Sequence, residues 1–477
     1  MRGVWRAESV RAAEAALMAR LPEGTLMRRA AAGLATRLAG LLRAGGGVYG
    51  SHVTMVVGAG DNGGDALYAG AALARRGATV VVLEVFPGRT HADGLAELES
   101  AGGRVVTEPP SRTDLIVDGV LGLGGRPGLP PAAGEIFNRL PPATTVAVDL
   151  PSGVEVDTGA AMAEAVRADI TVTFGCLKPA TTVGVGADLA GLVDRIDIGL
   201  EPFLPAPYAQ VPDLSDVVSW WPRPRPHDDK YTRGVLGVCA GSYRYPGAGE
   251  LAVGGALAGP AGYIRYAGTA SRHIRYSHPE VVTKDRVADA GRVTAWVAGP
   301  GMGTDSVAAS QLRSAMAAPV PMCLDADALT LVSEDHSILE DRQSPSVITP
   351  HDREYSRLAG HAPGNDRIGD ALHLARRLDC VVLLKGFRTV IASPNGNVHI
   401  NPTGDPALAT AGSGDVLAGL LGAMLAAGVP TERAAVAAAF FHGLAGRAAA
   451  RRGPVTATGV LAALPRVIGE ALDESRT

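Results

Sequence analysis

The sequence predicts an α/β protein built from two different domains. Its 477 residues exceed what one ordinary core holds, since domains average roughly 150 residues, so two cores are expected. Apolar residues make up 47% of the chain and charged residues 19%, which is typical of a globular protein. Short β-branched apolar runs alternate with segments of helical periodicity, a pattern typical of α/β folds.

The first half is predicted to be a Rossmann-like, doubly wound sheet. Residues 10–42 carry apolar residues at helical spacing, and Pro22 and Gly24 divide them into two helices. Short apolar runs follow, of the kind found in parallel strands buried on both faces, with helices as crossovers. The predicted strands are residues 53–58, 79–85, 115–120, 145–148 and 170–174.

A second α/β series begins after a proline-rich stretch, residues 200–226. This stretch predicts an ordered or semi-rigid linker, so we place the boundary near residue 210, with residues 1–210 and 211–477 as the two domains. Nothing suggests that the second half repeats the first. Its predicted strands are residues 234–240, 294–298, 321–324, 347–349, 381–384 and 389–392, and an alanine-rich helix pair spans residues 415–451.

The net charge and the positions of charged residues indicate which class of partner the protein binds. A net charge of −4 argues against a nucleic-acid or membrane surface, both of which select a basic face, and favours a small-molecule substrate. Charged residues interrupt the first twenty positions, and no apolar run reaches the roughly 18 residues of a membrane span, so a cytoplasmic protein is expected. The scattered cysteines are expected to be buried small hydrophobes: Cys176, Cys239, Cys323 and Cys380.

A glycine-rich turn, residues 56–65, joins a predicted strand to a predicted helix. Glycines there let backbone amides approach a phosphate at the helix N-terminus, although the turn is neither a GxGxxG fingerprint nor a P-loop. A tight connection alone would also use glycine. Three polar residues lie close together here, Asp61, Asn62 and Asp65. They favour a binding site, because a turn that only connects a strand to a helix does not need them.

Two further strand ends carry polar residues. Asp118 leads into a glycine-rich loop, and Asp149 is followed by Pro151 and Ser152. The carboxyl ends of parallel strands line one crevice, so these residues and Asn62 can converge.

With these motifs, the chain through Gly199 resembles the NAD(P)H-hydrate epimerase domain. The resemblance implies that Asn62, Asp118 and the Ser152 carbonyl hold a potassium ion, since oxygen ligands suit a hard cation. It also implies that Asp149 is the acid/base of epimerisation, where an aspartate that only caps a turn is the alternative.

Lys178 matches the family pattern without an assigned role. The implied dinucleotide-binding residues are Asp61, Asn62, Gly63, Gly64, Asp65, Gly122, Leu123, Gly124, Gly125, Arg126, Pro127, Gly128 and Asp149. Asp61, Ala66 and Leu123 depart from the family pattern.

The most specific motif in the chain, residues 401–419, lies in the second half. A glycine turn opens a long apolar helix, so the amides of residues 412–415 can form an anion hole beside the Asp415 carboxylate. This GxGD pattern resembles the ribokinase-like superfamily, in which the aspartate faces the substrate hydroxyl. An ordinary capping turn is the alternative.

Residues 227–465 follow the motif order of ADP/ATP-dependent NAD(P)H-hydrate dehydratases, which they resemble. In such an enzyme, Asp415 would deprotonate the substrate hydroxyl, ADP would phosphorylate it, and the ring nitrogen would expel phosphate, with magnesium neutralising the nucleotide. The implied substrate-binding residues are Ala248, Gly303, His351 and Asp415, and the implied nucleotide-binding residues are Lys385, Gly386, Phe387, Arg388, Thr389 and Gly414.

Several alternatives stay open at this point. Asp325 and Asp327 either bind magnesium through water or cap a turn, and His351 is either a ligand contact or an ordinary core or surface histidine. The function expected is epimerisation of R- and S-NAD(P)H hydrate (NADHX and NADPHX) and dehydration of the S form at the expense of ADP, giving AMP and phosphate. A ribokinase-like kinase of a small alcohol, or a dehydratase with a silent N-terminal binding module, is the alternative. A homo-oligomer is the default expectation.

Overall fold

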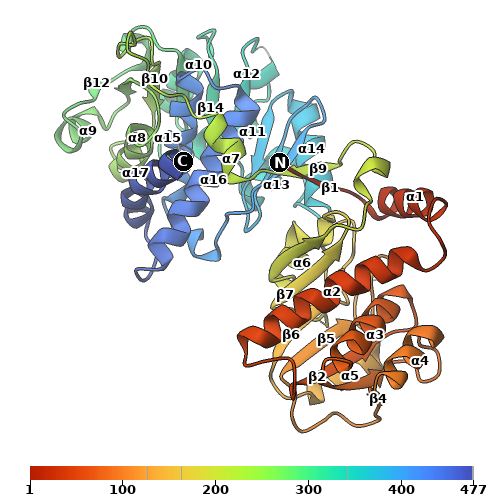
Figure 1. Ribbon diagram of the computed structural model, residues 1–477. Helices are drawn as coiled ribbons and strands as arrows, with labels where there is room; N and C mark the ends of the chain where they lie inside the picture. The colour runs from red at the N-terminus through yellow and green to blue at the C-terminus, as the bar shows by residue number, and fades with distance from the viewer. Residues whose placement is uncertain (126, 163, 341, 475–477) are drawn as a thin grey trace. The chain divides into compact units, whose positions relative to one another are not determined.

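The computed structural model describes residues 1–125, 127–162, 164–340 and 342–474. The chain divides into two units, Arg2–Ala209 and Gln210–Thr477, the second of which also includes Met1. Each unit is built on its own sheet (Figure 1). In the described part of the chain, no helix is long and apolar enough to cross a membrane.

The N-terminal unit is a parallel sheet in the order β4-β3-β2-β5-β6-β7-β8. The chain starts near the middle and winds outward in both directions, so the order reverses between β2 and β5, as the Rossmann-like class predicts. The strands are β2 (His52–Val57), β3 (Thr79–Glu84), β4 (Arg104–Val105), β5 (Leu115–Gly119), β6 (Thr144–Val148), β7 (Ile170–Phe174) and β8 (Leu192–Ile196). β1 (Arg2–Val4) precedes the first helix.

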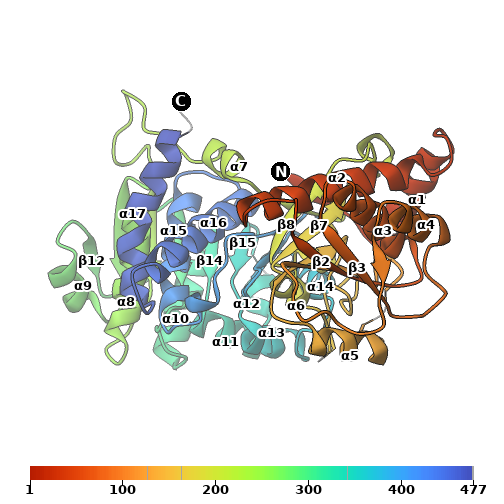
Figure 2. The ribbon, with the colours of Figure 1, turned by 60° about the horizontal axis from the view of Figure 1, so that its bottom comes forward.

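Helices cover both faces of this sheet. Along β2, Val53, Met55 and Val57 pack into the cluster that contains α2 and α3, whereas Val56 faces the cluster that contains Ala133 of α5. Figure 2 shows α2 and α3 on one face and α5 on the other. The helices are α1 (Ala7–Met18), α2 (Thr25–Ala44), α3 (Asp61–Ala74), α4 (Ala92–Ser100), α5 (Pro131–Arg139) and α6 (Gly184–Leu189), with short 3-10 turns at Pro179–Thr181 and Glu201–Phe203.

The C-terminal unit has a mixed sheet in the order β9-β18-β17-β16-β15-β14-β13-β10-β11-β12. Strands β10 to β16 pair in parallel, and β16, β17 and β18 pair antiparallel. The strands are β9 (Ala209–Val211), β10 (Val235–Cys239), β11 (Tyr263–Ala267), β12 (Val282–Lys284), β13 (Ala295–Ala298), β14 (Met322–Leu324), β15 (Ser346–Ile348), β16 (Val381–Leu384), β17 (Val390–Ala392) and β18 (Val398–Ile400). The proline-rich stretch contains structure of its own, because Gln210 of β9 pairs with His399 of β18.

The helices of this unit are α7 (Leu214–Ser219), α8 (Pro246–Leu257), α9 (Ser271–Ser277), α10 (Ser306–Met316), α11 (Asp327–Glu334), α12 (Ser337–Glu340), α13 (Asp352–Ala359), α14 (Arg367–Leu378), α15 (Ser413–Ala426), α16 (Thr431–Ala450) and α17 (Ala457–Glu474). Short 3-10 turns lie at Val287–Asp289 and Pro406–Leu408. In Figure 2, α15, α16 and α17 lie over one face of the sheet and α10, α11 and α13 over the other.

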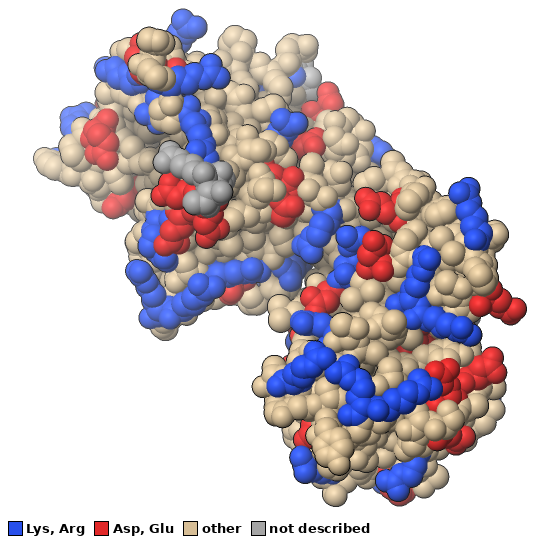
Figure 3. All heavy atoms as spheres, viewed as in Figure 1, with Lys and Arg blue, Asp and Glu red and all other residues tan. Residues whose placement is uncertain are grey.

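The four cysteines are buried and unpaired with one another. The face shown in Figure 3 carries both basic and acidic side chains.

Helix α15 packs against α8 at backbone distance. A Cβ on Gly419 would come within 1.9 Å of the Ala252 carbonyl oxygen, and one on Gly255 within 2.2 Å of the Val416 carbonyl oxygen. Both positions therefore need glycine, and this close packing fixes the N-terminus of α15, where the GxGD turn lies.

We expect Gly419→Ala to lower the free energy of unfolding of the C-terminal unit by about 1–3 kcal/mol, because the added carbon overlaps a carbonyl group that cannot rotate away. Urea unfolding measures the change. Gly469→Ala is the matched control: nothing lies within 4 Å of its added carbon, so it should stabilise helix α17 by about 0.5–1 kcal/mol. Equal effects of the two substitutions would contradict the packing argument.

Candidate active sites

In the N-terminal unit, two loops meet where the strand order reverses. They follow the neighbouring strands β2 and β5. A Cβ on Gly58 would come within 2.1 Å of the Val120 carbonyl oxygen, so the loops are in backbone contact. Helix α3 begins at Asp61 with no side-chain cap, so its first amides face the space in front of the helix, where anions bind.

Asn62, Asp118 and Ser152 come together around Leu121. Ser152 donates its backbone N–H to Asp118 Oδ2 (2.8 Å) and its hydroxyl to Oδ1 (2.6 Å). The Asn62 side chain donates to the Leu121 carbonyl (3.0 Å), and the Leu121 N–H donates to Ser152 Oγ (2.9 Å). Asp118 is fully buried, and its burial outweighs these hydrogen bonds and raises its pKa to about 6.

Asp149 forms a buried ion pair with Lys178. Lys178 Nζ donates to Asp149 Oδ1 (2.5 Å), to Thr173 Oγ1 (3.0 Å) and to the Phe174 carbonyl (3.1 Å). Lys178 is 1% exposed; burial disfavours its ammonium, but the Asp149 carboxylate outweighs this and the pKa of Lys178 is raised. Asp149 has φ of +63°, a strained conformation for a non-glycine residue and one that is common at functional sites. The Asp149 carboxylate is therefore held firmly.

The glycine-rich loop after β5 packs against the turn that contains Ser152. The Gly128 N–H donates to the Gly153 carbonyl (2.8 Å), and the Gly125 N–H donates to the Gly122 carbonyl (2.7 Å). Arg126, which the resemblance assigns to the dinucleotide, lies outside the described residues.

The sequence predicted helix α1 (Ala7–Met18) but not its contact with this site. Arg11 donates to the Leu123 carbonyl (2.6 Å), which holds α1 against the glycine-rich loop. Glu14 lies one turn further along; burial first, and then the charges of Asp149 and Asp61, raise its pKa to about 6 against the opposing charge of Lys178. Neither residue belongs to a recognisable motif, because the only signal in α1 is the spacing of its apolar residues.

In the C-terminal unit, Gly412 and Asp415 form the turn that opens α15. Gly412 has φ of +84°, in the left-handed region that favours glycine. Buried His442 makes a hydrogen bond through Nε2 to the Ser413 carbonyl (2.9 Å), and burial lowers the pKa of His442 to about 4, so it is neutral and is the donor. The turn is therefore braced by α16.

Asp415 faces a network of buried charges. Lys385 Nζ donates to Asp325 Oδ1 (2.7 Å) and lies 3.6 Å from Glu354 Oε2. A Cβ on Gly414 would lie 3.5 Å from Lys385 Nζ and 3.8 Å from Asp325 Oδ2, so the turn and the network touch. Burial, followed by the charge of Asp325, raises the pKa of Asp415 to about 7.

The other predicted residues lie around this network. The Gly303 N–H donates to Asp327 Oδ2 (2.8 Å), and a Cβ on Gly301 would come within 2.6 Å of the Ala248 methyl. Asp325 is thus paired with Lys385, and Asp327 accepts a hydrogen bond from the loop that contains Gly303. Residues 385–389 join β16 to β17, and Thr389 Oγ1 donates to the Gly386 carbonyl (3.2 Å). The ring of Phe387 lies under the Arg388 guanidinium.

His351 and Glu354 form the N-terminal capping box of α13. His351 Nδ1 accepts from the backbone N–H groups of Arg353 and Glu354, and Glu354 Oε2 accepts from the His351 N–H (2.8 Å). Glu354 is 4% exposed and near Lys385, and the sequence interpretation left it without a role. Its spacing of three residues from His351 is the signal that could have identified it.

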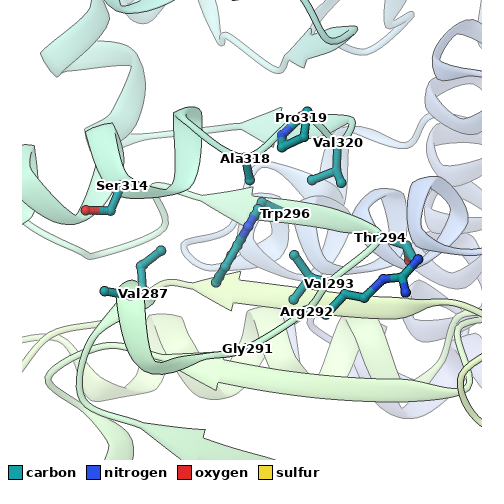
Figure 4. Close-up of a pocket in the computed structure, with 11 residues that line it drawn as sticks. Val287, Gly291, Arg292, Val293, Thr294, Trp296, Ser314, Ala318, Pro319 and Val320 are labelled. Atoms are coloured by element: carbon teal, nitrogen blue, oxygen red, sulfur yellow. The ribbon is translucent and has the colours of Figure 1, made fainter.

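A hollow of about 580 Å³ lies at the opposite edge of this sheet (Figure 4). It is lined by Trp296 of β13 and by residues that precede β13 and β14, including Val293 and Val320, whereas Asp325 and Lys385 follow the carboxyl ends of β14 and β16. None of the site residues predicted from the sequence lines it.

The fold and the glycine turn place the C-terminal unit in the ribokinase-like class. A solved ribokinase-like superfamily protein from Enterococcus faecalis matches 55% of this chain and 96% of its own, with a TM-score of 0.51 and 22% identity, and shows the same fold. Residues 236–466 match the family model of NAD(P)H-hydrate dehydratase, and residues 23–180 that of the YjeF-related protein N-terminus.

Similarity extends over both units. Bifunctional NAD(P)H-hydrate repair enzymes from Mycobacterium tuberculosis and Mycobacterium leprae are 49% and 46% identical to this chain, over 91% and 93% of each sequence. The chain belongs to the family of bifunctional NAD(P)H-hydrate repair enzymes. This confirms the resemblance that the motifs indicate.

We expect Lys178→Met to destabilise the N-terminal unit by about 3–5 kcal/mol, because it leaves the buried Asp149 carboxylate without its partner. The double variant Lys178→Met/Asp149→Leu should recover most of this loss. A double-mutant cycle of urea unfolding measures the coupling. Additive effects would show that the two groups do not interact.

Proposed function

We propose that this chain repairs hydrated NADH and NADPH in two steps. The N-terminal unit interconverts the R and S epimers, and the C-terminal unit dehydrates the S form with ADP, giving AMP and phosphate. The observation that carries this proposal is the similarity of both units to bifunctional repair enzymes, together with the half-buried Asp415 carboxylate in the glycine turn at the N-terminus of α15. A small-alcohol kinase would account for the second unit alone.

In the dehydratase site, Asp415 would accept the proton of the substrate hydroxyl as its oxygen attacks the terminal phosphorus of ADP and AMP leaves. The amides of Gly412–Asp415 would stabilise the transferring phosphoryl group. The ring nitrogen then expels phosphate, and loss of a proton from the neighbouring ring carbon restores the dihydropyridine. Supporting this role, Asp415 has a pKa of about 7, so it is poised to take up a proton near neutrality.

The carboxylates near Asp415 suit a magnesium ion that is carried by the nucleotide. Asp325 and Asp327 both act electrostatically on Asp415. Among the described residues, no group of three or more His, Cys, Asp or Glu side chains could hold a metal by itself. This fits magnesium, which is commonly bound by one or two carboxylates with water and substrate phosphates. When bound, the ion would neutralise phosphate charge.

We assign a potassium ion to Asn62, Asp118 and the Ser152 carbonyl. In the described part of the chain, fully buried Asp118 has hydrogen-bond donors but no charged partner, so a monovalent cation would compensate it. The Ser152 carbonyl accepts from the Val166 N–H (2.9 Å) and keeps a second lone pair for an ion. The ion would supply charge compensation beside the dinucleotide.

In the epimerase site, Asp149 would take the proton of the ring hydroxyl. Its ion pair with Lys178 keeps it ready as a base. Residues 61–65 and 122–128 would hold the dinucleotide, because uncapped amides and glycines line the loops there.

The test follows both epimers. Mixed R- and S-NADPHX with ADP and magnesium should be converted fully to NADPH by the natural chain, as measured by absorbance. With Asp149→Asn, conversion to NADPH should stop once the S epimer is consumed. With Asp415→Asn, no NADPH should form, but the epimers should still interconvert. Full recovery by Asp149→Asn at the natural rate would instead support a silent N-terminal module.

The dehydratase rate should depend on pH through Asp415. Its pKa is raised to about 7, so the proton-accepting form is scarce below pH 6 and predominates above pH 8. With S-NADPHX as the substrate, kcat/KM is therefore expected to rise about tenfold per pH unit below this pKa and then level off. Stopped-flow absorbance at constant ionic strength measures it, and a flat profile from pH 5 to 8 would exclude Asp415 as the base.

A further inference from the structure

The epimerase site contains two carboxylates in opposite environments. Asp149 is paired with Lys178 and also accepts hydrogen bonds from Thr173 Oγ1 (3.0 Å) and the Phe174 N–H (3.3 Å). Asp65, in the first turns of α3, is 9% exposed, and its buried Oδ1 has no hydrogen-bond partner among the residues that the structure describes. Asp149 Oδ1 thus has a cation and two further hydrogen-bond donors, whereas the described residues provide no donor to Asp65 Oδ1.

Among the described residues, the charges that act on Asp65 are all negative. They come from Asp149, from Asp61 on the same helix and from Glu14 on α1. His91, which caps α4, packs against Gly64, the residue before Asp65. Two cations in the described part of this site have other partners, since Lys178 binds Asp149 and Arg11 donates to the Leu123 carbonyl. Burial first, and then these anions, raise the pKa of Asp65 well above its ordinary value, which favours the protonated form of its carboxyl group.

Epimerisation needs an acid as well as a base. Removal of the hydroxyl proton forms C=O at the hydroxylated ring carbon and breaks its bond to the ring nitrogen. The bonding pair goes to that nitrogen, which takes up a proton. After rotation, the nitrogen attacks the other face of the carbonyl, the nitrogen loses its proton and the oxygen regains one. No oxidant or reductant is required. Carboxyl groups whose environments separate their protonation states are suited to such paired roles.

We propose that Asp65 is the general acid of the epimerase site: it gives its proton to the ring nitrogen while Asp149 takes the hydroxyl proton, and the two exchange roles on closure. This inference rests on the proposed epimerase function. Residues 61–65 would hold the dinucleotide through their backbone amides, and the inference adds a catalytic role for the Asp65 side chain. A protonated, unpartnered carboxyl is a hydrogen-bond donor awaiting an acceptor, whereas an anionic one beside three others would repel a phosphate.

The experiment uses the full chain and mixed R- and S-NADPHX without ADP, so that epimer exchange alone is followed by chromatography. Asp65→Asn keeps the shape and the neutral charge of the protonated acid but cannot give up a proton. We expect a loss of about 10²-fold or more in the epimerisation rate. Dissociation constants for NADPHX and the dehydratase rate on the S epimer should stay within about threefold, which separates loss of chemistry from loss of binding or folding.

The pH profile gives a second readout that needs no altered chain. In the natural protein, epimerisation should fall at high pH as Asp65 loses its proton, and this decline should be absent from the residual rate of Asp65→Asn. Glu14→Gln tests the rival acid, and it should keep the decline. An Asp65→Asn rate within threefold of natural, or a decline lost in Glu14→Gln instead, would overturn the assignment of Asp65. Absence of epimerisation in the natural chain would refute the proposed function itself.

Discussion

Both sites depend on carboxylates that are removed from water at or beyond the carboxyl ends of parallel strands. Asp118 and Asp325 are 0% and 1% exposed, and Asp149 is 6% exposed. Burying an isolated carboxylate is costly, so each such group needs a cation, several hydrogen-bond donors or a proton. The chain uses all three solutions: Asp149 and Asp325 have lysines, Asp118 has donors and a proposed ion, and Asp415 has a raised pKa.

The two units reach the same electrostatic arrangement on different folds. In each, one lysine pairs with one buried aspartate and leaves a second carboxylate facing negative charge: Lys178 and Asp149 leave Asp65, and Lys385 and Asp325 leave Asp415. The ion pair fixes the charge of the first carboxylate. The negative charges around the second carboxylate raise its pKa. Both proposed reactions begin with removal of a proton from the same hydroxyl group. This arrangement supplies, in each unit, two carboxyl groups that hold a proton with different affinity.

The sequence allowed the main strands and the glycine turns to be predicted, because their patterns are local. The parallel runs appear as β2, β3, β5, β6 and β7, and the carboxyl-end rule anticipated that Asn62, Asp118 and Ser152 meet. Glu14 and Arg11 could not be found in this way, since their importance comes only from α1 lying against a loop more than a hundred residues later. The proline-rich stretch was expected to be a linker, but β9 gains its strand pairing from β18, a distant partner. Non-local pairing of this kind leaves no periodic signal in a short segment.

Lysine at position 178 is explained by the number of acceptors around it. Among 44 basic residues, 40 are arginines, so the composition favours arginine wherever either residue suffices. Lys178 Nζ has three hydrogens and finds three acceptors, on Asp149, Thr173 and Phe174. A guanidinium would bring five N–H donors and a larger planar group into a position that is 1% exposed, leaving donors unsatisfied and displacing the aspartate. The need for a compact cation with three donors therefore selects lysine here.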